Sequence, residues 1–262
     1  MRAMSIAATG MQAQQTNVEV ISNNIANMDT TAYSRRRPQF TDLLYQYVTR
    51  VGTYSSDVNT IVPSGVQIGL GVMTESIYRL TQQGSLNNTG NTLDLAIQGN
   101  GYFQVQLPTG EIAYTRDGSF QISPTGQIVT QQGYTVLPGV TIPNNATGIS
   151  INASGQVSVT LDTQITPTIA GQFQTATFPN EAGLEAQGNN IYLQTQSSGA
   201  PLVASPASVG YGSVLQGFLE NSNVNIVTEI TDLISAQRAY EMNSKVIQSA
   251  DEMMQTVTQL KS

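Results

Sequence analysis

Cysteine, histidine and tryptophan are all absent from this 262-residue chain. Without cysteine there are no disulfides, zinc–thiolate sites or thiol nucleophiles, and without histidine there is no Ser-His-Asp triad and no histidine-ligated metal. Neither a Gly-x-Ser-x-Gly motif nor a P-loop occurs. Asp94 with Asp117 could still act as an acid–base pair, but Asp117 stands in an Asp-Gly turn, where backbone geometry favours aspartate. We therefore expect no enzyme, no catalytic residue, no metal and no cofactor.

Positive charge is also scarce, because 10 Lys and Arg oppose 17 Asp and Glu and give a net charge of −7. Nucleic-acid binding requires basic patches and is not expected. The one basic cluster, Arg35-Arg36-Arg37, is interpreted as a solvated turn, with a contact to another subunit as the alternative. No apolar run approaches the roughly 18–20 residues of a membrane span, so membrane insertion is not expected. The N-terminal apolar run is too short for a signal peptide, so export would need a route without a cleaved signal.

Two amphipathic helices are predicted at the ends of the chain. The N-terminal seam follows the alternating spacing of 3 and 4 that is typical of a coiled coil, and it consists of Met4, Ala7, Met11, Gln14, Val18, Ile21, Ile25 and Met28. The C-terminal helix, from Asn223 to Leu260, has no Gly or Pro, and its apolar residues are Ile226, Ile230, Leu233, Val246, Ala250, Met253, Val257 and Leu260. Asn223 is the expected N-cap.

The N-terminal helix is not expected to be stable alone. Its six large apolar seam residues contribute about 2 kcal/mol each when buried, whereas fixing about 25 backbone residues costs roughly 1–2 kcal/mol apiece. Two partners could stabilise it: the C-terminal helix in a closed hairpin, or the helices of other subunits.

The middle of the chain changes to a period of two, from Ile77 to about Gln194, as in Tyr102–Leu107. Turn signals such as Pro108-Thr109-Gly110 and Asp117-Gly118 separate these runs. The predicted fold class is therefore α+β, with the terminal helices in a coiled-coil-like layer and a central all-β domain of short antiparallel strands, barrel-like or sandwich-like.

Four motifs resemble the rod and hook family of bacterial flagellar axial proteins. The first comprises Asn23, Asn24, Ile25, Ala26, Asn27, Thr30 and Tyr33, with Ala32 where the family usually has Gly. The two central motifs are residues 94–103 and 114–120, and the C-terminal one is residues 237–245. The resemblance covers essentially the whole chain.

The resemblance implies a structural subunit that polymerises into the rigid distal rod, transmits torque from motor to hook and encloses the export channel. It implies a terminal helical domain (1–34 with 223–262), an extended segment contacting neighbouring subunits (35–75) and a central β domain (76–222). The implied partners are further copies of the chain, proximal rod proteins, hook protein, the P and L ring proteins and the export apparatus. The implied location is the basal body, from periplasm to outer membrane.

The resemblance also implies residue roles. The segment from Gln46 through Tyr54 to Val62 would stiffen the shaft. The expected subunit-interface residues are Met4, Met11, Val18, Ile21, Asn24, Ile25, Asn27, Met28, Ile226, Ile230, Leu233, Val246, Met253, Val257 and Leu260. The alternative function is a secreted, stalked β binding module, of the phage-tail or adhesin type, whose stalk would be one continuous coiled coil.

Overall fold

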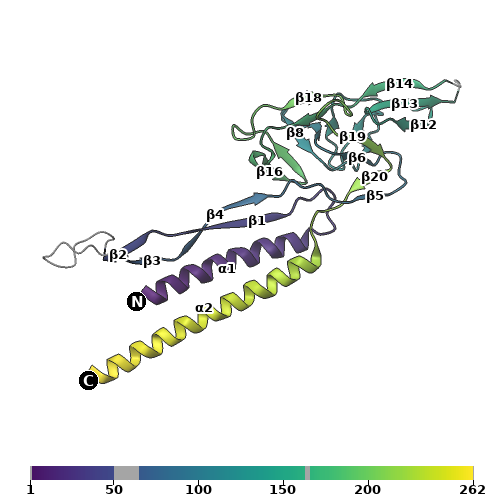
Figure 1. Ribbon diagram of the computed structural model, residues 1–262. Helices are drawn as coiled ribbons and strands as arrows, with labels where there is room; N and C mark the ends of the chain where they lie inside the picture. Colours follow the sequence, from purple (N-terminus) through teal and green to yellow (C-terminus); the bar gives the residue numbers. More distant parts are fainter. Residues whose placement is uncertain (1, 50–64, 163–165, 262) are drawn as a thin grey trace. The chain divides into compact units, whose positions relative to one another are not determined.

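The computed structural model describes residues 2–49, 65–162 and 166–261 (Figure 1). The chain divides into two compact units, which we name the helical unit (residues 1–26, 36–79 and 225–262) and the β unit (residues 27–35 and 80–224). The chain passes between them after residues 26, 35, 79 and 224. The three-part domain organisation expected from the sequence stays a prediction.

The helical unit contains the two predicted helices, α1 (Arg2–Ala26) and α2 (Ile226–Lys261), side by side (Figure 1). They run antiparallel, because Asn24 contacts Glu229 while Gly10 lies against Asn243. A Cβ at Gly10 would stand 2.9 Å from the Asn243 side-chain nitrogen. Glycine costs roughly 1 kcal/mol relative to alanine inside a helix, and here its missing side chain allows the close approach.

Two antiparallel strand pairs complete the helical unit. Strand β1 (Arg36–Asp42) pairs with β4 (Val72–Arg79), and β2 (Tyr45–Thr49) pairs with β3 (Val66–Gly69). Both β1 and β4 contact α1. The Thr9 hydroxyl accepts a bond from the Val72 backbone N–H at 3.4 Å, and a Cβ at Gly71, whose φ is +125°, would collide with Thr9. Helix α1 therefore packs against α2 on one side and against the β1–β4 strand pair on another.

The β unit is built from short antiparallel strands. Its largest sheet has the order β16-β17-β8-β7-β11-β10-β9, with β15 pairing β7 and β18, and smaller sheets join β12-β13-β14, β19-β6 and β20-β5. The bounds are β5 Leu86–Asn88, β6 Leu95–Gln98, β7 Tyr102–Gln106, β8 Ile112–Thr115, β9 Gln121–Ile122, β10 Ile128–Val129, β11 Thr135–Val136, β12 Ala146–Ile151, β13 Gln156–Leu161, β14 Thr168–Gln172, β15 Thr175–Thr177, β16 Glu185–Gly188, β17 Ile191–Leu193, β18 Leu202–Ala204, β19 Ser213–Gln216 and β20 Phe218–Glu220, with a 3-10 turn at Glu181–Gly183.

The core of the β unit gathers around three phenylalanines. Phe103 lies edge-on to Phe120 at 5.1 Å between ring centroids and to Phe173 at 6.4 Å, and both Phe103 and Phe173 are fully buried. The alternation predicted for β7 is observed, since Phe103 and Val105 enter this core while Tyr102 joins a second cluster with Tyr114. The predicted α+β class is confirmed. No sheet among residues 80–162 and 166–224 closes into a barrel.

Candidate assembly surfaces

The face of α2 that packs on α1 is small and polar. Glu229, Ala236, Asn243 and Ala250 recur every seven residues, and Glu229, Ala236 and Ala250 are buried. At one end of the pair, the Asn24 side-chain N–H donates to the Glu229 carboxylate at 3.1 Å, and both residues are almost fully buried. Small side chains allow two helices to approach closely, and Leu233 and Ile247, which lie between these positions, are half-buried.

Most large apolar residues of α2 remain exposed in two groups. The N-terminal group is Ile226, Val227, Ile230 and Ile234, and the C-terminal group is Met242, Val246, Met253 and Met254. Ile230 is 45% exposed, Val246 46% and Met253 63%. Four of the predicted seam residues, Ile226, Ile230, Val246 and Met253, are among these exposed residues, and an exposed apolar surface of this kind is typical of one that a protein partner covers.

The other predicted interface residues differ in how far their side chains are buried. On α1, Ile21 and Asn24 are buried, whereas Met4, Met11, Val18 and Ile25 are half-buried, as is Leu233 on α2. In the β unit, Asn27 is half-buried and Met28 is exposed, and in the helical unit Gln46 is exposed on β2. Tyr54 and Val62, and the side chains of Val257 and Leu260, lie outside the described residues. The role of these residues between subunits stays a prediction.

The predicted N-cap of α2 is wrong. Asn225 caps the helix, because its side-chain oxygen accepts the backbone N–H groups of Val227 at 3.1 Å and Thr228 at 3.3 Å. Asn223 instead joins two segments of the β unit. Its side-chain oxygen accepts from the Arg35 backbone N–H at 2.6 Å, and its side-chain N–H donates to the Gln82 carbonyl at 2.8 Å.

Asn24 has the same kind of role in the helical unit. Its side chain accepts from the Arg36 backbone N–H at 2.9 Å and donates to the Arg36 carbonyl at 2.8 Å, fixing the start of β1 beside the end of α1. The Asn-rich stretch that follows forms the predicted turn, in which Thr30 N–H donates to the Asn27 carbonyl. Ala32 takes a positive φ of 56°, the conformation that a glycine adopts more readily.

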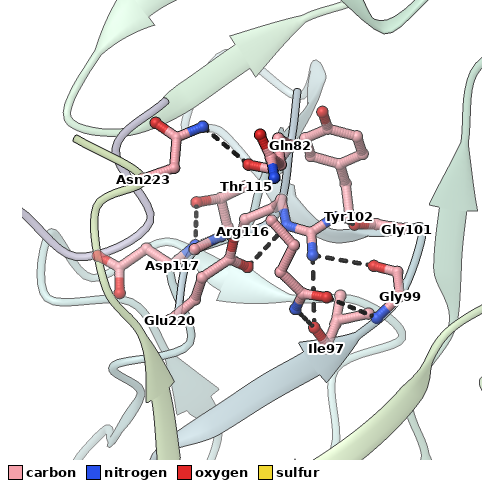
Figure 2. Close-up of polar contacts among 12 residues, drawn as sticks. Gln82, Ile97, Gly99, Gly101, Tyr102, Thr115, Arg116, Asp117, Glu220 and Asn223 are labelled. Carbon is pink, nitrogen blue, oxygen red and sulfur yellow. Dashed lines mark hydrogen bonds and ion pairs between the residues drawn. The ribbon is translucent and has the colours of Figure 1, made fainter. Parts of the chain in front are cut away.

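A buried ion pair lies where the two central motifs of the β unit meet (Figure 2). Arg116 Nε donates to the Glu220 carboxylate at 2.9 Å, and its guanidinium also donates to the carbonyls of Gly99 at 2.9 Å and Gly101 at 3.2 Å. The guanidinium carbon stands 5.7 Å from the centre of the Tyr102 ring. Both glycines have positive φ, as their predicted role in tight turns requires.

Sequence reasoning missed this pair. Glu220 accepts a second bond from the Gly84 backbone N–H at 3.1 Å, so it joins three separate segments of the β unit. One signal was available: Arg116 is the only Lys or Arg between residues 80 and 224. A lone basic residue in a long domain whose other charged residues are all acidic indicates a specific partner more often than a solvated surface.

The two carboxylates considered for acid–base chemistry both accept hydrogen bonds from residues in their own local turns. Asp94 accepts from the Thr89 hydroxyl at 2.6 Å and the Asn91 amide at 2.9 Å, while Asp117 accepts from the Ser119 backbone at 3.0 Å. No group of three or more Asp or Glu that could hold a metal is found among the described residues. No helix within the described ranges is long and apolar enough to cross a membrane.

Comparison with known proteins matches three regions of the chain. Residues 4–33 match the family described as flagella basal body rod protein, residues 96–159 the D1 domain of the flagellar hook protein FlgE/F/G, and residues 215–260 the C-terminal region of flagellar basal body rod FlgEFG proteins. These regions contain α1, the strands around Arg116 and Gly99, and α2.

Curated relatives match along the entire chain. The flagellar basal-body rod protein FlgG of Caulobacter vibrioides is 56% identical over 100% of both chains. FlgG of Agrobacterium fabrum is 51% identical over 98% of both, and that of Bacillus subtilis is 37% identical over 100% of this chain and 99% of its own. The chain therefore belongs to the FlgG family of flagellar basal-body rod proteins.

Proposed function

We propose that this chain is a structural subunit that polymerises into the rigid distal rod of the bacterial flagellum. The observation that carries the proposal is the exposure of the two apolar groups of α2 in a helix that already has a partner. The stalked-module alternative requires one continuous coiled coil, whereas α1 and α2 pair antiparallel. The family relationship supports a non-enzymatic role at the basal body.

The free energy of burying the two apolar groups favours a subunit that has both groups covered by neighbours. Burying the remaining half of an exposed Ile, Val or Met contributes about 1 kcal/mol, so the two groups together offer about 8 kcal/mol. Association costs roughly 4–15 kcal/mol in lost translational and rotational freedom. A neighbour that covers one group returns about 4 kcal/mol, at the lower end of this cost, whereas neighbours that together cover both groups return about 8 kcal/mol, which lies well within its range. Growth is then confined to the tip of an existing polymer.

In the proposed rod, the helical units pack around the export channel and the β units form the outer wall. Torque passes through the packed interfaces between subunits. The proposed partners are proximal rod proteins below, hook protein above, the P and L rings around the shaft and the export apparatus. Residues 46–62 are proposed to stiffen the shaft.

The test places a charge in the exposed apolar groups. Ile230→Asp and Val246→Asp should leave the secondary structure and melting temperature of the dilute protein unchanged, because both side chains are exposed, and should abolish polymers seen by sedimentation and electron microscopy. Gln248→Asp, at an exposed polar position on the same helix, is the matched control and should polymerise. Normal polymers from both apolar variants would refute the proposal.

A further inference from the structure

A groove of about 500 Å³ lies between the two helices of the helical unit. Helix α1 contributes Gln15, Val18 and Glu19 to it, and α2 contributes Gln237, Tyr240 and Glu241. The α2 residues belong to the C-terminal motif noted in the sequence, and neither of the apolar groups of α2 takes part. The motif therefore builds a surface that is separate from those groups.

The groove has the chemistry of a cation site. Tyr240 is 44% exposed and offers a ring face, and Glu19 and Glu241 place two exposed carboxylates beside it. The Gln15 amide donates to Glu19 at 3.2 Å and so orients that carboxylate. No Lys or Arg is among the lining residues. An aromatic face with adjacent carboxylates suits a planar guanidinium, which stacks on the ring and donates to the carboxylate oxygens.

The chain itself carries a matching pair of guanidinium groups. Arg36 and Arg37 are adjacent and exposed at the start of β1, in the same helical unit. Arg116 is buried in its ion pair, Arg35 and Arg79 are half-buried, and the exposed Arg2, Arg238 and Lys245 each have no cationic neighbour in the sequence. In the described part of the chain, Arg36 and Arg37 are therefore the only adjacent cationic residues that are both exposed.

These arginines are not among the residues that line the groove of their own chain. The Arg36 backbone is fixed to Asn24, which lies about 10 Å along α1 from the middle of the groove at a rise of about 1.5 Å per residue. Two different complementary patches on one subunit are what a head-to-tail contact requires, and such a contact produces an open helical assembly.

We propose that the groove between α1 and α2 binds the Arg36-Arg37 segment of a second copy of this chain. The inference rests on the proposed function, since it specifies one contact within the polymer. The guanidinium of one copy stacks on Tyr240 of the next and pairs with Glu19 and Glu241. The basic cluster is thereby assigned to a subunit contact instead of a solvated turn.

Charge exchange between two variants tests the contact. One variant carries Glu19→Arg and Glu241→Arg, and the other carries Arg36→Glu and Arg37→Glu. Each variant alone sets like charges against each other, and its critical concentration for polymerisation should rise about tenfold or more. In an equimolar mixture the two variants can alternate along this contact, and every groove of an alternating polymer meets the opposite charge, so the critical concentration should return close to that of the unaltered chain. Melting temperatures should stay unchanged, because the four side chains are exposed.

The outcomes separate this inference from the proposed function. If the unaltered chain forms no polymer under conditions in which a relative does, the proposed function fails. If the unaltered chain and both variants polymerise equally, or if mixing does not restore assembly, the groove contact is wrong while the rod function stands. A matched control variant, Glu111→Arg with Glu185→Arg, changes the net charge by the same amount as the groove variant, at exposed positions of the β unit. It should polymerise normally.

Discussion

Glu220→Gln should destabilise the β unit by about 3–5 kcal/mol, because it removes one partner of a buried ion pair and leaves the charge of Arg116 in a low-dielectric site. The substitution keeps the shape of the side chain, and the amide oxygen can still accept from Gly84. Arg116 retains the carbonyls of Gly99 and Gly101 but loses the only carboxylate that it contacts among the described residues. Whole domains are stable by roughly 5–15 kcal/mol, so the loss is large.

The measurement is urea unfolding followed by near-ultraviolet circular dichroism, to which the packed tyrosines 102, 114 and 192 contribute. Glu111→Gln, which removes a carboxylate from an exposed position of the same unit, is the control and should change stability by less than about 0.5 kcal/mol. The double variant Arg116→Met with Glu220→Leu should recover only part of the loss, because the glycine carbonyls are left without a donor. A change below about 1 kcal/mol for Glu220→Gln would refute the reasoning.

Three further outcomes are expected. Ile25→Asp, at a half-buried seam position, should abolish polymer formation while the near-ultraviolet spectrum of the β unit stays native; a variant that still builds rods would contradict the seam assignment. Deletion of residues 46–62 should give polymers that bend in electron micrographs, and straight polymers would place the rigidity elsewhere. Burial raises the pKa of Tyr114 above 10.0, so its contribution to stability is complete below about pH 10 and is lost as pH rises through the raised value. Tyr114→Phe should therefore flatten the fall in melting temperature between pH 9 and 11.

The elements that depend on local pattern were predicted well. The 3–4 spacing indicated both helices, the period of two indicated the strands, and the Asn-rich stretch indicated a turn. What the sequence could not decide was which side of α2 would meet α1. Of the predicted apolar seam, Ala250 is buried and Leu233 half-buried, but the pairing also uses Ala236 and Asn243, which hydrophobicity did not favour and whose position permits close approach.

Contacts between distant residues were the main omission. Arg116 and Glu220 are separated by 104 positions, and Asn24 and Glu229 by 205, so no periodicity relates them. The N-cap was misplaced by two residues for a related reason: Asn223 and Asn225 are equally good caps by residue type, and the distant segments that bind Asn223 decide between them. Polar residues joining separate segments are the feature that residue-by-residue reading detects least.

The buried contact between Asn24 and Glu229 also bears on how the helix pair carries a load along its length. Sliding α2 past α1 by one turn, about 5.4 Å, would separate the amide from the carboxylate and break this buried hydrogen bond. Small apolar side chains alone would offer little resistance to such shear, since one alanine is much like the next. The polar contact therefore resists sliding of one helix along the other. Axial strain is then transmitted to the next subunit and does not become slippage between the two helices of one subunit.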